Sequence, residues 1–415
     1  MAVSDLILNR LLDLQGTDFE VVDCKVLEDK ITWRVRHRVG IYECPRCHAQ
    51  LTSCHAKRWI TLKDTPFGMR QCIWQVERAQ ILCTCSNNLR VEYMPFRAKH
   101  HHLTKRFVDQ IEQVLCSKMF TVADVARLFQ VDYGTVYKID HDVLLRLWQQ
   151  CEIPNPINIS VDEKSYKKGH NYVTIVTDVD LGKVIWVSEG NRKDSLDIFF
   201  QVIGEERCKQ IQTVSKDLHK PYALSCQDYI PHAIEVADPF HVVKKLNECM
   251  DECRKELAVE SKIKPTKRKK IFRLNWVLRY KQENMKGSHM ESLEELAKLN
   301  EPLYLAYLHK EAFYEFFLFK PSEVDEANNF LISWITEAFK SKLKGLQEFA
   351  EYISRNTGIL LNIIKTQRSS AISEGINRKI STLQSMACGY KCLQYFMLKI
   401  MQRCGVLGKY WSPAT

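Results

Sequence analysis

The sequence predicts an α/β protein in which a mixed sheet carries a long helical insertion and follows two small units, one β and one all-α. Three observations predict this class. Residues 157–240 follow the order strand, strand, strand, helix, strand, helix, strand. Residues 241–366 place apolar side chains three and four positions apart, which is helical spacing. Residues 42–88 hold short β-like segments broken by close cysteine pairs and turn residues, which indicates a small β unit.

The composition is that of a globular protein. Of the 415 residues, 45% are hydrophobic and 27% are charged, which argues against disordered and fibrous classes and favours two or three domains. No apolar run is long enough to span a membrane, and the N-terminal segment lacks the apolar core of a signal peptide. We therefore expect a soluble cytosolic protein without a membrane partner. The net charge of +10 is compatible with a polyanionic partner but does not establish one.

Two close cysteine pairs, Cys44 with Cys47 and Cys83 with Cys85, are separated by 35 residues. The chain is too long to be a small secreted disulfide scaffold, so its 16 cysteines are better interpreted as reduced thiols and metal ligands. Each pair provides half of a tetrahedral thiolate site, which favours Zn²⁺ in a structural role. The alternative is that Cys83 and Cys85 are buried free thiols and that the first pair only marks a turn.

Residues 120–144 have the pattern of a helix-turn-helix within a segment, 103–148, that predicts three short helices. Thr121 is a good N-cap, and Asp124 stands at the third helical position, as in a capping box. After a short turn, the start of the second helix is expected to enter the major groove of DNA with Tyr133, Thr135 and Lys138. The alternative is an ordinary three-helix packing unit.

Three predicted strands of the central segment end in an aspartate: Asp162, Asp217 and Asp238. Three antiparallel strands followed by helix, strand, helix and strand is the order of an RNase H-like fold, and open α/β sheets bind ligands at the carboxyl ends of their strands. Taken singly, each aspartate is more simply a turn or cap residue.

A further acidic residue, Glu374, begins a predicted helix after a polar turn. Carboxylates that converge from distant segments favour Mg²⁺, and two such ions clamp the attacking and leaving oxygens of a phosphoryl transfer. Glu374 is the candidate that completes this set. The alternative is an ordinary acidic residue in the first turn of a helix.

The chain resembles the ISL3-type insertion-sequence transposases of the DDE class over essentially its full length. The resemblance rests on CPRC with His55, on the helix-turn-helix, and on four segments: VDEKSYKKGHNYVTIVTD, VSKDLHKPY, ADPFHVVKKLN and SAISEGINRKISTLQSMACGY. It implies that two Mg²⁺ ions, or Mn²⁺ in their place, are held by Asp162, Asp217 and Glu374. It also implies that Asp238 and His241 belong to the site, through a DxxH motif.

The basic run in the insertion contains Lys267, Arg268 and Lys269 and is followed by three aromatic residues spaced four apart. Such interleaving is typical of a surface that binds a nucleic-acid backbone and stacks unpaired bases. However, Phe272, Trp276 and Tyr280 are spaced to share one helical face, and this spacing favours a core stripe over nucleic-acid binding.

The resemblance implies a transposase that binds terminal inverted repeats and target double-stranded DNA, and cleaves and transfers strands. It would act as a homodimer or larger assembly, in the bacterial cytoplasm at the nucleoid. The alternative is a zinc and helix-turn-helix regulator whose RNase H-like half is inactive. The expected domains are a zinc-binding domain (1–98), a helix-turn-helix domain (99–150), the first part of an RNase H-like catalytic domain (151–241), a helical insertion (242–366), and the final catalytic helix with its tail (367–415).

Overall fold

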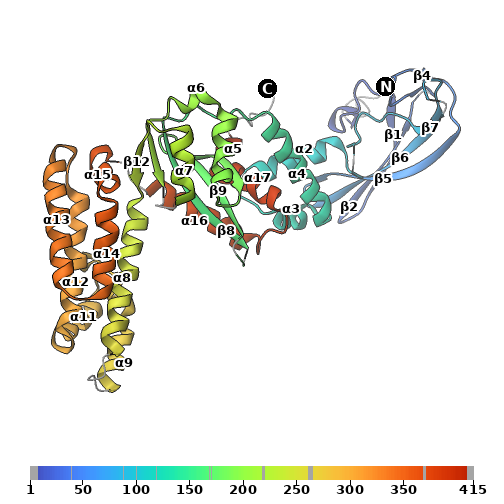
Figure 1. The fold of residues 1–415 in the computed structure, drawn as a ribbon. Helices are drawn as coiled ribbons and strands as arrows, with labels where there is room; N and C mark the ends of the chain where they lie inside the picture. The colour runs from blue at the N-terminus through green and yellow to red at the C-terminus, as the bar shows by residue number, and fades with distance from the viewer. Residues whose placement is uncertain are drawn as a thin grey trace. The chain divides into compact units, whose positions relative to one another are not determined.

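The structure is a computed structural model that describes residues 8–408 except 39, 87, 100, 118, 168, 170, 217–219, 260–264 and 368–370. The described residues form two compact units, one up to Gln150 and one from Cys151 (Figure 1). The finer five-part division at residues 98, 241 and 366 remains a prediction. Among the described residues, no helix has the length and apolar character needed to cross a membrane.

The N-terminal unit is built on a five-stranded sheet with the order β1-β2-β6-β5, in which β7 also pairs with β6. The strands, together with the separate β3–β4 ladder, are β1 (Phe19–Val26), β2 (Lys30–His37), β3 (Tyr42–Glu43), β4 (Gln50–Leu51), β5 (Ala56–Phe67), β6 (Arg70–Leu82) and β7 (Leu89–Val91). Short strands were expected here, but β5 and β6 form a long antiparallel hairpin. Period-two alternation buries one face of the sheet, including Leu62, Trp74 and Val76.

Three helices follow in the same unit: α2 (Lys105–Cys116), α3 (Val122–Phe129) and α4 (Tyr133–Gln149). The predicted capping box is confirmed, because the Thr121 hydroxyl accepts from the Asp124 amide and the Asp124 carboxylate accepts from the Thr121 amide. Gln130, in the left-handed conformation, ends α3, and Asp132 caps α4.

The second unit contains a five-stranded sheet with the order β10-β9-β8-β11-β12. Its strands are β8 (Asn158–Lys167), β9 (Asn171–Asp178), β10 (Lys183–Glu189), β11 (Thr213–Lys216) and β12 (Ile234–Ala237). β9 is antiparallel to both β8 and β10, and β11 is parallel to both β8 and β12. The predicted succession of strands and helices is therefore confirmed, although β8 continues five residues past Asp162 instead of ending there.

Helices cover the sheet on both sides, which explains why every residue from Val173 to Asp178 in β9 is buried. Figure 1 shows α5 (Lys193–Ile203) and α7 (Lys220–Tyr229) on one face and α16 (Ala371–Met386) and α17 (Leu393–Cys404) on the other. The short α6 (Glu205–Cys208) follows α5. One long final helix was expected, but Cys388 and Gly389 adopt positive φ and separate α16 from α17. Residues 406–408 form a last 3₁₀ turn, η4.

The insertion between β12 and α16 is helical, as predicted. Its elements are α8 (Pro239–Val259), α9 (Pro265–Arg273), α10 (Asn275–Arg279), η1 (Gln282–Asn284), α11 (Gly287–Leu299), α12 (Glu301–Phe313), η2 (Tyr314–Leu318), η3 (Pro321–Glu323), α13 (Val324–Lys340), α14 (Lys344–Arg355) and α15 (Thr357–Thr366). They enclose one apolar core that includes Trp334 and Phe349. The expected aromatic core stripe is wrong: the helix breaks at Leu274, and the Trp276 side chain is 66% exposed.

Candidate active site

β8, β11 and β12 run parallel and in register in the second sheet. Val161 pairs with Lys216, and Lys216 pairs with Ala237, so these residues form a row across β8, β11 and β12. Asp162 directly follows Val161, and Asp238 directly follows Ala237. Asp217 is the next residue after Lys216 in the sequence and lies outside the described residues. Lys216 itself is buried, and its ammonium group lies 3.0 Å from Glu235 Oε2.

Asp162 and Asp238 are both largely enclosed, with 13% and 7% of their side chains exposed. Asp162 Oδ1 accepts a hydrogen bond from the Glu163 amide at 2.7 Å and lies 3.7 Å from His241 Nε2. Its Oδ2 accepts a hydrogen bond from the Asn377 amide group. Burial alone would raise the pKa of Asp162, but His241 and Asn377 outweigh burial and hold the pKa below its usual value. Asp162 is therefore an ionised carboxylate in the folded protein.

Asp238 and His241 lie at the start of α8. Asp238 Oδ1 accepts from the Phe240 amide at 2.8 Å, so the aspartate caps the helix. Its other oxygen lies 4.0 Å from His241 Nε2. The His241 imidazole therefore lies within 4.0 Å of two carboxylates, those of Asp162 and Asp238.

Glu374 is brought to the same place by α16. The Ser373 hydroxyl lies 2.8 Å from the Ser160 hydroxyl, which fixes the start of α16 against β8. Glu374 is paired with Arg378 one turn further along the helix. A pocket of about 460 Å³ is lined by Asp162, Lys164, Asp238, Phe240, Glu374, Asn377, Arg378, Ser381 and Thr382. Three acidic residues from β8, the end of β12 and α16 thus line one cavity, although more than 200 residues separate Asp162 from Glu374.

Two further polar residues of this pocket, Asn377 and Ser381, were not predicted from the sequence. Asn377 donates to Asp162, and Ser381 Oγ accepts from Lys164 Nζ at 2.8 Å. Their signal in the sequence is positional: they follow Glu374 by three and seven residues and so share its face of the helix. Because that spacing is common in any helix, only the packing of α16 on β8 identifies them.

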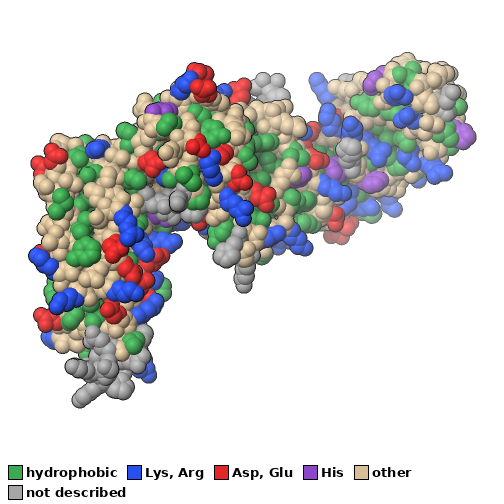
Figure 2. Space-filling model, in the orientation of Figure 1, with side chains coloured by type: hydrophobic (Ala, Val, Ile, Leu, Met, Phe, Trp, Pro, Cys, Tyr) green, Lys and Arg blue, Asp and Glu red, His purple; other side chains and the backbone are tan. Residues whose placement is uncertain are grey.

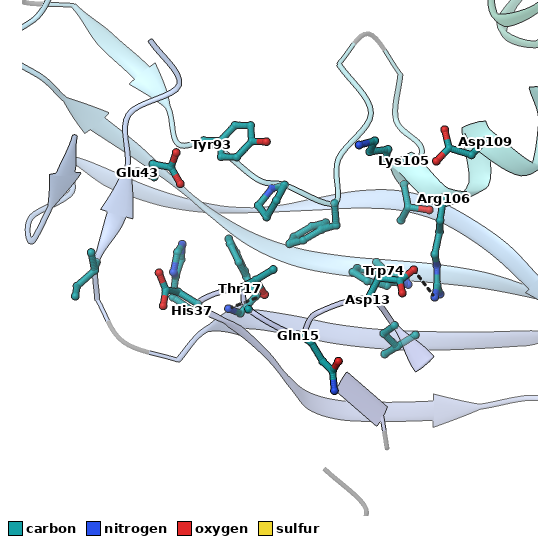
Figure 3. A pocket seen from close by; sticks show the side chains of 18 residues that line it. Asp13, Gln15, Thr17, His37, Glu43, Trp74, Tyr93, Lys105, Arg106 and Asp109 are labelled. Carbon is teal, nitrogen blue, oxygen red and sulfur yellow. Dashed lines mark hydrogen bonds and ion pairs between the residues drawn. The ribbon is translucent and has the colours of Figure 1, made fainter. Parts of the chain in front are cut away.

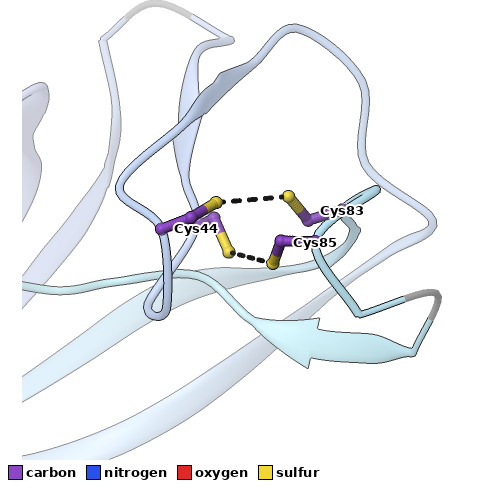
Figure 4. A group of neighbouring side chains, drawn as sticks. Cys44, Cys83 and Cys85 are labelled. Carbon is purple, nitrogen blue, oxygen red and sulfur yellow. Dashed lines mark hydrogen bonds between the residues drawn. The ribbon is translucent and has the colours of Figure 1, made fainter.

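The four predicted zinc ligands converge in the N-terminal unit (Figure 4). The sulfur atoms of Cys44, Cys47, Cys83 and Cys85 all lie within 4.8 Å of one another, with 3.7 Å from Cys44 to Cys85 and 3.6 Å from Cys47 to Cys83. These distances are too long for disulfides, which are about 2.05 Å. A tetrahedron with Zn–S bonds of about 2.3 Å has edges of about 3.8 Å. The cluster is therefore compatible with zinc.

The surroundings of the cluster shift the pKa values of Cys44 and Cys85 in opposite directions. Backbone amides of Cys47 and Arg46 donate to the Cys44 sulfur and lower the pKa of Cys44 to about 6. A hydrogen bond with Cys83, together with burial, raises the pKa of Cys85 to about 12. Four adjacent sulfurs can all be thiolates only beside a cation, which is what a metal would provide.

The remaining predicted DNA-contacting residues lie on two helices. At the start of α4, Tyr133 and Lys138 are exposed and Thr135 is half-buried. In α9, Lys269 is exposed, whereas the side chains of Lys267 and Arg268 lie outside the described residues.

A second pocket, of about 510 Å³, lies in the N-terminal unit (Figure 3). His37, Glu43 and Tyr93 stand at one end, and Asp13 and Arg106 stand at the other. None of the predicted site residues lines this pocket. Arg106 is paired with Asp13, and His37 is paired with Glu92.

Comparison with known proteins gives a consistent result. Residues 159–400 match the model of the ISL3-type DDE family, whose description is transposase. The chain is 26% identical over 359 residues to the transposase for insertion sequence element IS1001 of Bordetella parapertussis, covering 86% of this chain and 87% of that protein. It is 28% identical over 398 residues to the transposase for insertion sequence element IS1557 of Mycobacterium tuberculosis, covering 88% and 86%. Because the matched segment includes more than half of the chain and all of the acidic pocket, this protein belongs to the ISL3 family of insertion-sequence transposases.

Proposed function

We propose that this transposase cleaves DNA at the ends of its insertion sequence and transfers the freed strands to target DNA, in a Mg²⁺-dependent reaction on an RNase H-like sheet. The observation that carries the proposal is the pocket that gathers Asp162, Asp238 and Glu374 at the carboxyl edge of that sheet. The strand order supports an RNase H-like fold, since three antiparallel strands precede two parallel ones.

The donor set of the pocket fits Mg²⁺. Carboxylate oxygens are the hard ligands that this ion prefers, and Mn²⁺ accepts the same set. Asp162, Asp217 and Glu374 are the proposed ligands of two ions, which would activate the attacking hydroxyl and stabilise the departing 3′ oxygen. Asn377 orients Asp162 by holding one of its oxygens. His241 faces Asp162 and Asp238 and is placed to hold both carboxylates in position.

We further propose that the four cysteines bind one Zn²⁺ in a structural role. Four protein thiolates leave no coordination position open for chemistry. The ion would tie the β3–β4 segment to the end of β6, because Cys44 and Cys47 flank the turn after β3 and Cys83 and Cys85 directly follow β6.

DNA contacts are assigned to the N-terminal unit and to the insertion. The exposed start of α4, with Tyr133, Thr135 and Lys138, has the form of a recognition helix for terminal inverted repeats. Figure 2 shows Lys and Arg side chains spread over the visible face of the N-terminal unit, which suits contact with phosphates. Lys267, Arg268 and Lys269 would contact the DNA backbone from α9. Joining two element ends calls for a homodimer or larger assembly, acting on DNA in the bacterial cytoplasm.

The test uses the full chain, duplexes that carry the ends of the encoding element, and Mg²⁺. Strand nicking is scored on a denaturing gel and duplex binding by mobility shift. Asp162→Asn, Asp217→Asn and Glu374→Gln should each abolish nicking and leave binding intact. Glu205→Gln, a matched change of an exposed carboxylate in α6, should leave both unchanged.

The competing function is a DNA-binding regulator whose second unit does no chemistry. Binding without nicking by the unmodified chain, in both Mg²⁺ and Mn²⁺, would favour the regulator. Equal loss of nicking and binding in Asp162→Asn would instead show that this residue serves the fold.

A further inference from the structure

The pocket contains polar side chains besides its carboxylates. Asp162, Asp238 and Glu374 form its acidic side, and the remaining polar lining is basic or neutral: Lys164, Asn377, Arg378, Ser381 and Thr382. The volume of about 460 Å³ lies within the range of small-ligand sites. The pocket therefore offers a ligand both carboxylate groups and cationic groups.

Lys164 is directed to this pocket by the strand that carries Asp162. The two residues are two positions apart in β8, so their side chains leave the same face of the sheet. Lys164 is partly buried, and its ammonium donates to Ser381 Oγ at 2.8 Å. Within the described parts of the chain, no ion pair joins Lys164 to a carboxylate, even though three carboxylates line the same pocket.

Ser381 holds Lys164 in place from α16. Glu374, Asn377, Arg378, Ser381 and Thr382 follow the spacing of three and four that puts them on one helical face. The Ser381 hydroxyl donates to the Asn377 carbonyl at 2.9 Å, so its oxygen is oriented to accept from Lys164. An ammonium group has three donors, and this bond uses one of them. Lys164 therefore has donors left for a ligand in the pocket.

We propose that Lys164, positioned by Ser381, binds the DNA phosphate that neighbours the scissile phosphate. A partly buried cation is stabilised by a counter-charge. Among the described residues, Lys164 is hydrogen-bonded to the neutral Ser381 hydroxyl and forms no ion pair. A DNA strand that places one phosphate at the acidic side brings the adjacent phosphate with it, which supplies the missing negative charge. This inference rests on the proposed function, because it assumes that DNA is cleaved at the acidic side.

The experiment measures nicking rates on element-end duplexes in which single phosphates near the cleavage position are replaced by neutral methylphosphonates. In the unmodified protein, one such position should slow nicking about ten- to hundredfold, the effect of losing one charge-assisted hydrogen bond. Lys164→Gln should slow nicking of unmodified DNA by a similar factor. Combining that variant with that methylphosphonate should cause no further loss, since both changes remove the same contact.

Three variants complete the design. Lys164→Arg should restore most of the rate because it keeps the charge, and Ser381→Ala should lower the rate less than Lys164→Gln. Lys209→Gln changes an exposed lysine of the same unit outside the pocket and should have no effect. The methylphosphonate scan on the unmodified protein needs no substitution, so misfolding of a variant cannot decide the result.

Two outcomes would overturn the inference in different ways. In the first outcome, the unmodified protein nicks DNA, but every methylphosphonate that slows its nicking slows Lys164→Gln by the same factor. The phosphate site is then wrong, and the proposed nuclease function stands. If the unmodified protein binds the duplex and never nicks it, the proposed function fails and the phosphate site fails with it.

Discussion

Asp64 is expected to be the main polar link between the sheet and the helices of the N-terminal unit. Its carboxylate accepts from Trp74 Nε1 at 2.9 Å, from the Thr104 hydroxyl at 2.5 Å and from Arg106 Nε at 2.8 Å. Trp74 belongs to the sheet, whereas Thr104 and Arg106 begin α2. Burial opposes the charged form of Arg106, but the Asp64 carboxylate outweighs it and raises the pKa of the guanidinium. Asp64→Ala removes this common acceptor.

The expected cost follows from the burial of the pair. Asp64 is fully buried, and the Arg106 side chain is 27% exposed. Breaking a fully buried ion pair costs about 3–5 kcal/mol. Partial access of water to Arg106 places the cost at the lower end, about 3 kcal/mol. For a domain of this size, that lowers the melting temperature by roughly 6–12 °C.

The assay combines thermal unfolding of the full chain with hydrogen–deuterium exchange of peptides from β5 and α2, which reports the N-terminal unit separately. Arg36→Ala is the matched control, because it breaks an exposed ion pair with Glu20 at 3.4 Å and should cost under about 1 kcal/mol. If exchange in β5 and α2 is no faster in Asp64→Ala than in the control, the carboxylate does not hold these elements together.

Three further predictions concern the metal cluster and the helical insertion. Cys47→Ser should reduce bound zinc from one per chain to a small fraction, measured by elemental analysis; equal zinc in both proteins would contradict the thiolate site. Burial lowers the pKa of His309 despite the opposing charge of Glu337. The contribution of the neutral His309 to the free energy of unfolding is therefore complete above the unfolded pKa of about 6.5 and is lost as the pH falls. Urea midpoints between pH 7 and 5 should therefore fall less in His309→Gln than in the unmodified chain, and parallel curves would refute this. Gly345→Ala should cost about 1–3 kcal/mol in urea unfolding, because its Cβ would collide with the Cys249 carbonyl where α14 meets α8. Gly358→Ala, with nothing within 4 Å, should be neutral or stabilising, and an equal loss in both variants would exclude the packing explanation.

Local signals in the sequence predicted local structure well. Thr121 and Asp124 predicted a capping box because its hydrogen bonds join residues three apart. The close spacing within each cysteine pair correctly placed two sulfurs together, and the two pairs converge because β6 ends beside the β3–β4 segment. Two local predictions were wrong: the aromatic core stripe and the single long final helix. The helices break at Leu274 and at residues 387–392, and the backbone conformations at these breaks cannot be predicted from apolar spacing.

Periodicity and residue type act over a few positions, so the succession of strands, the helical insertion and the candidate acidic residues could be predicted without a structure. Which of those residues come together depends on the packing of whole elements. The packing of α16 on β8 brings Glu374 into the pocket of Asp162 and adds Asn377 and Ser381, which no spacing distinguishes from other helical residues. Contacts between positions more than 200 residues apart depend on how complete elements pack, and that information is distributed over the whole core.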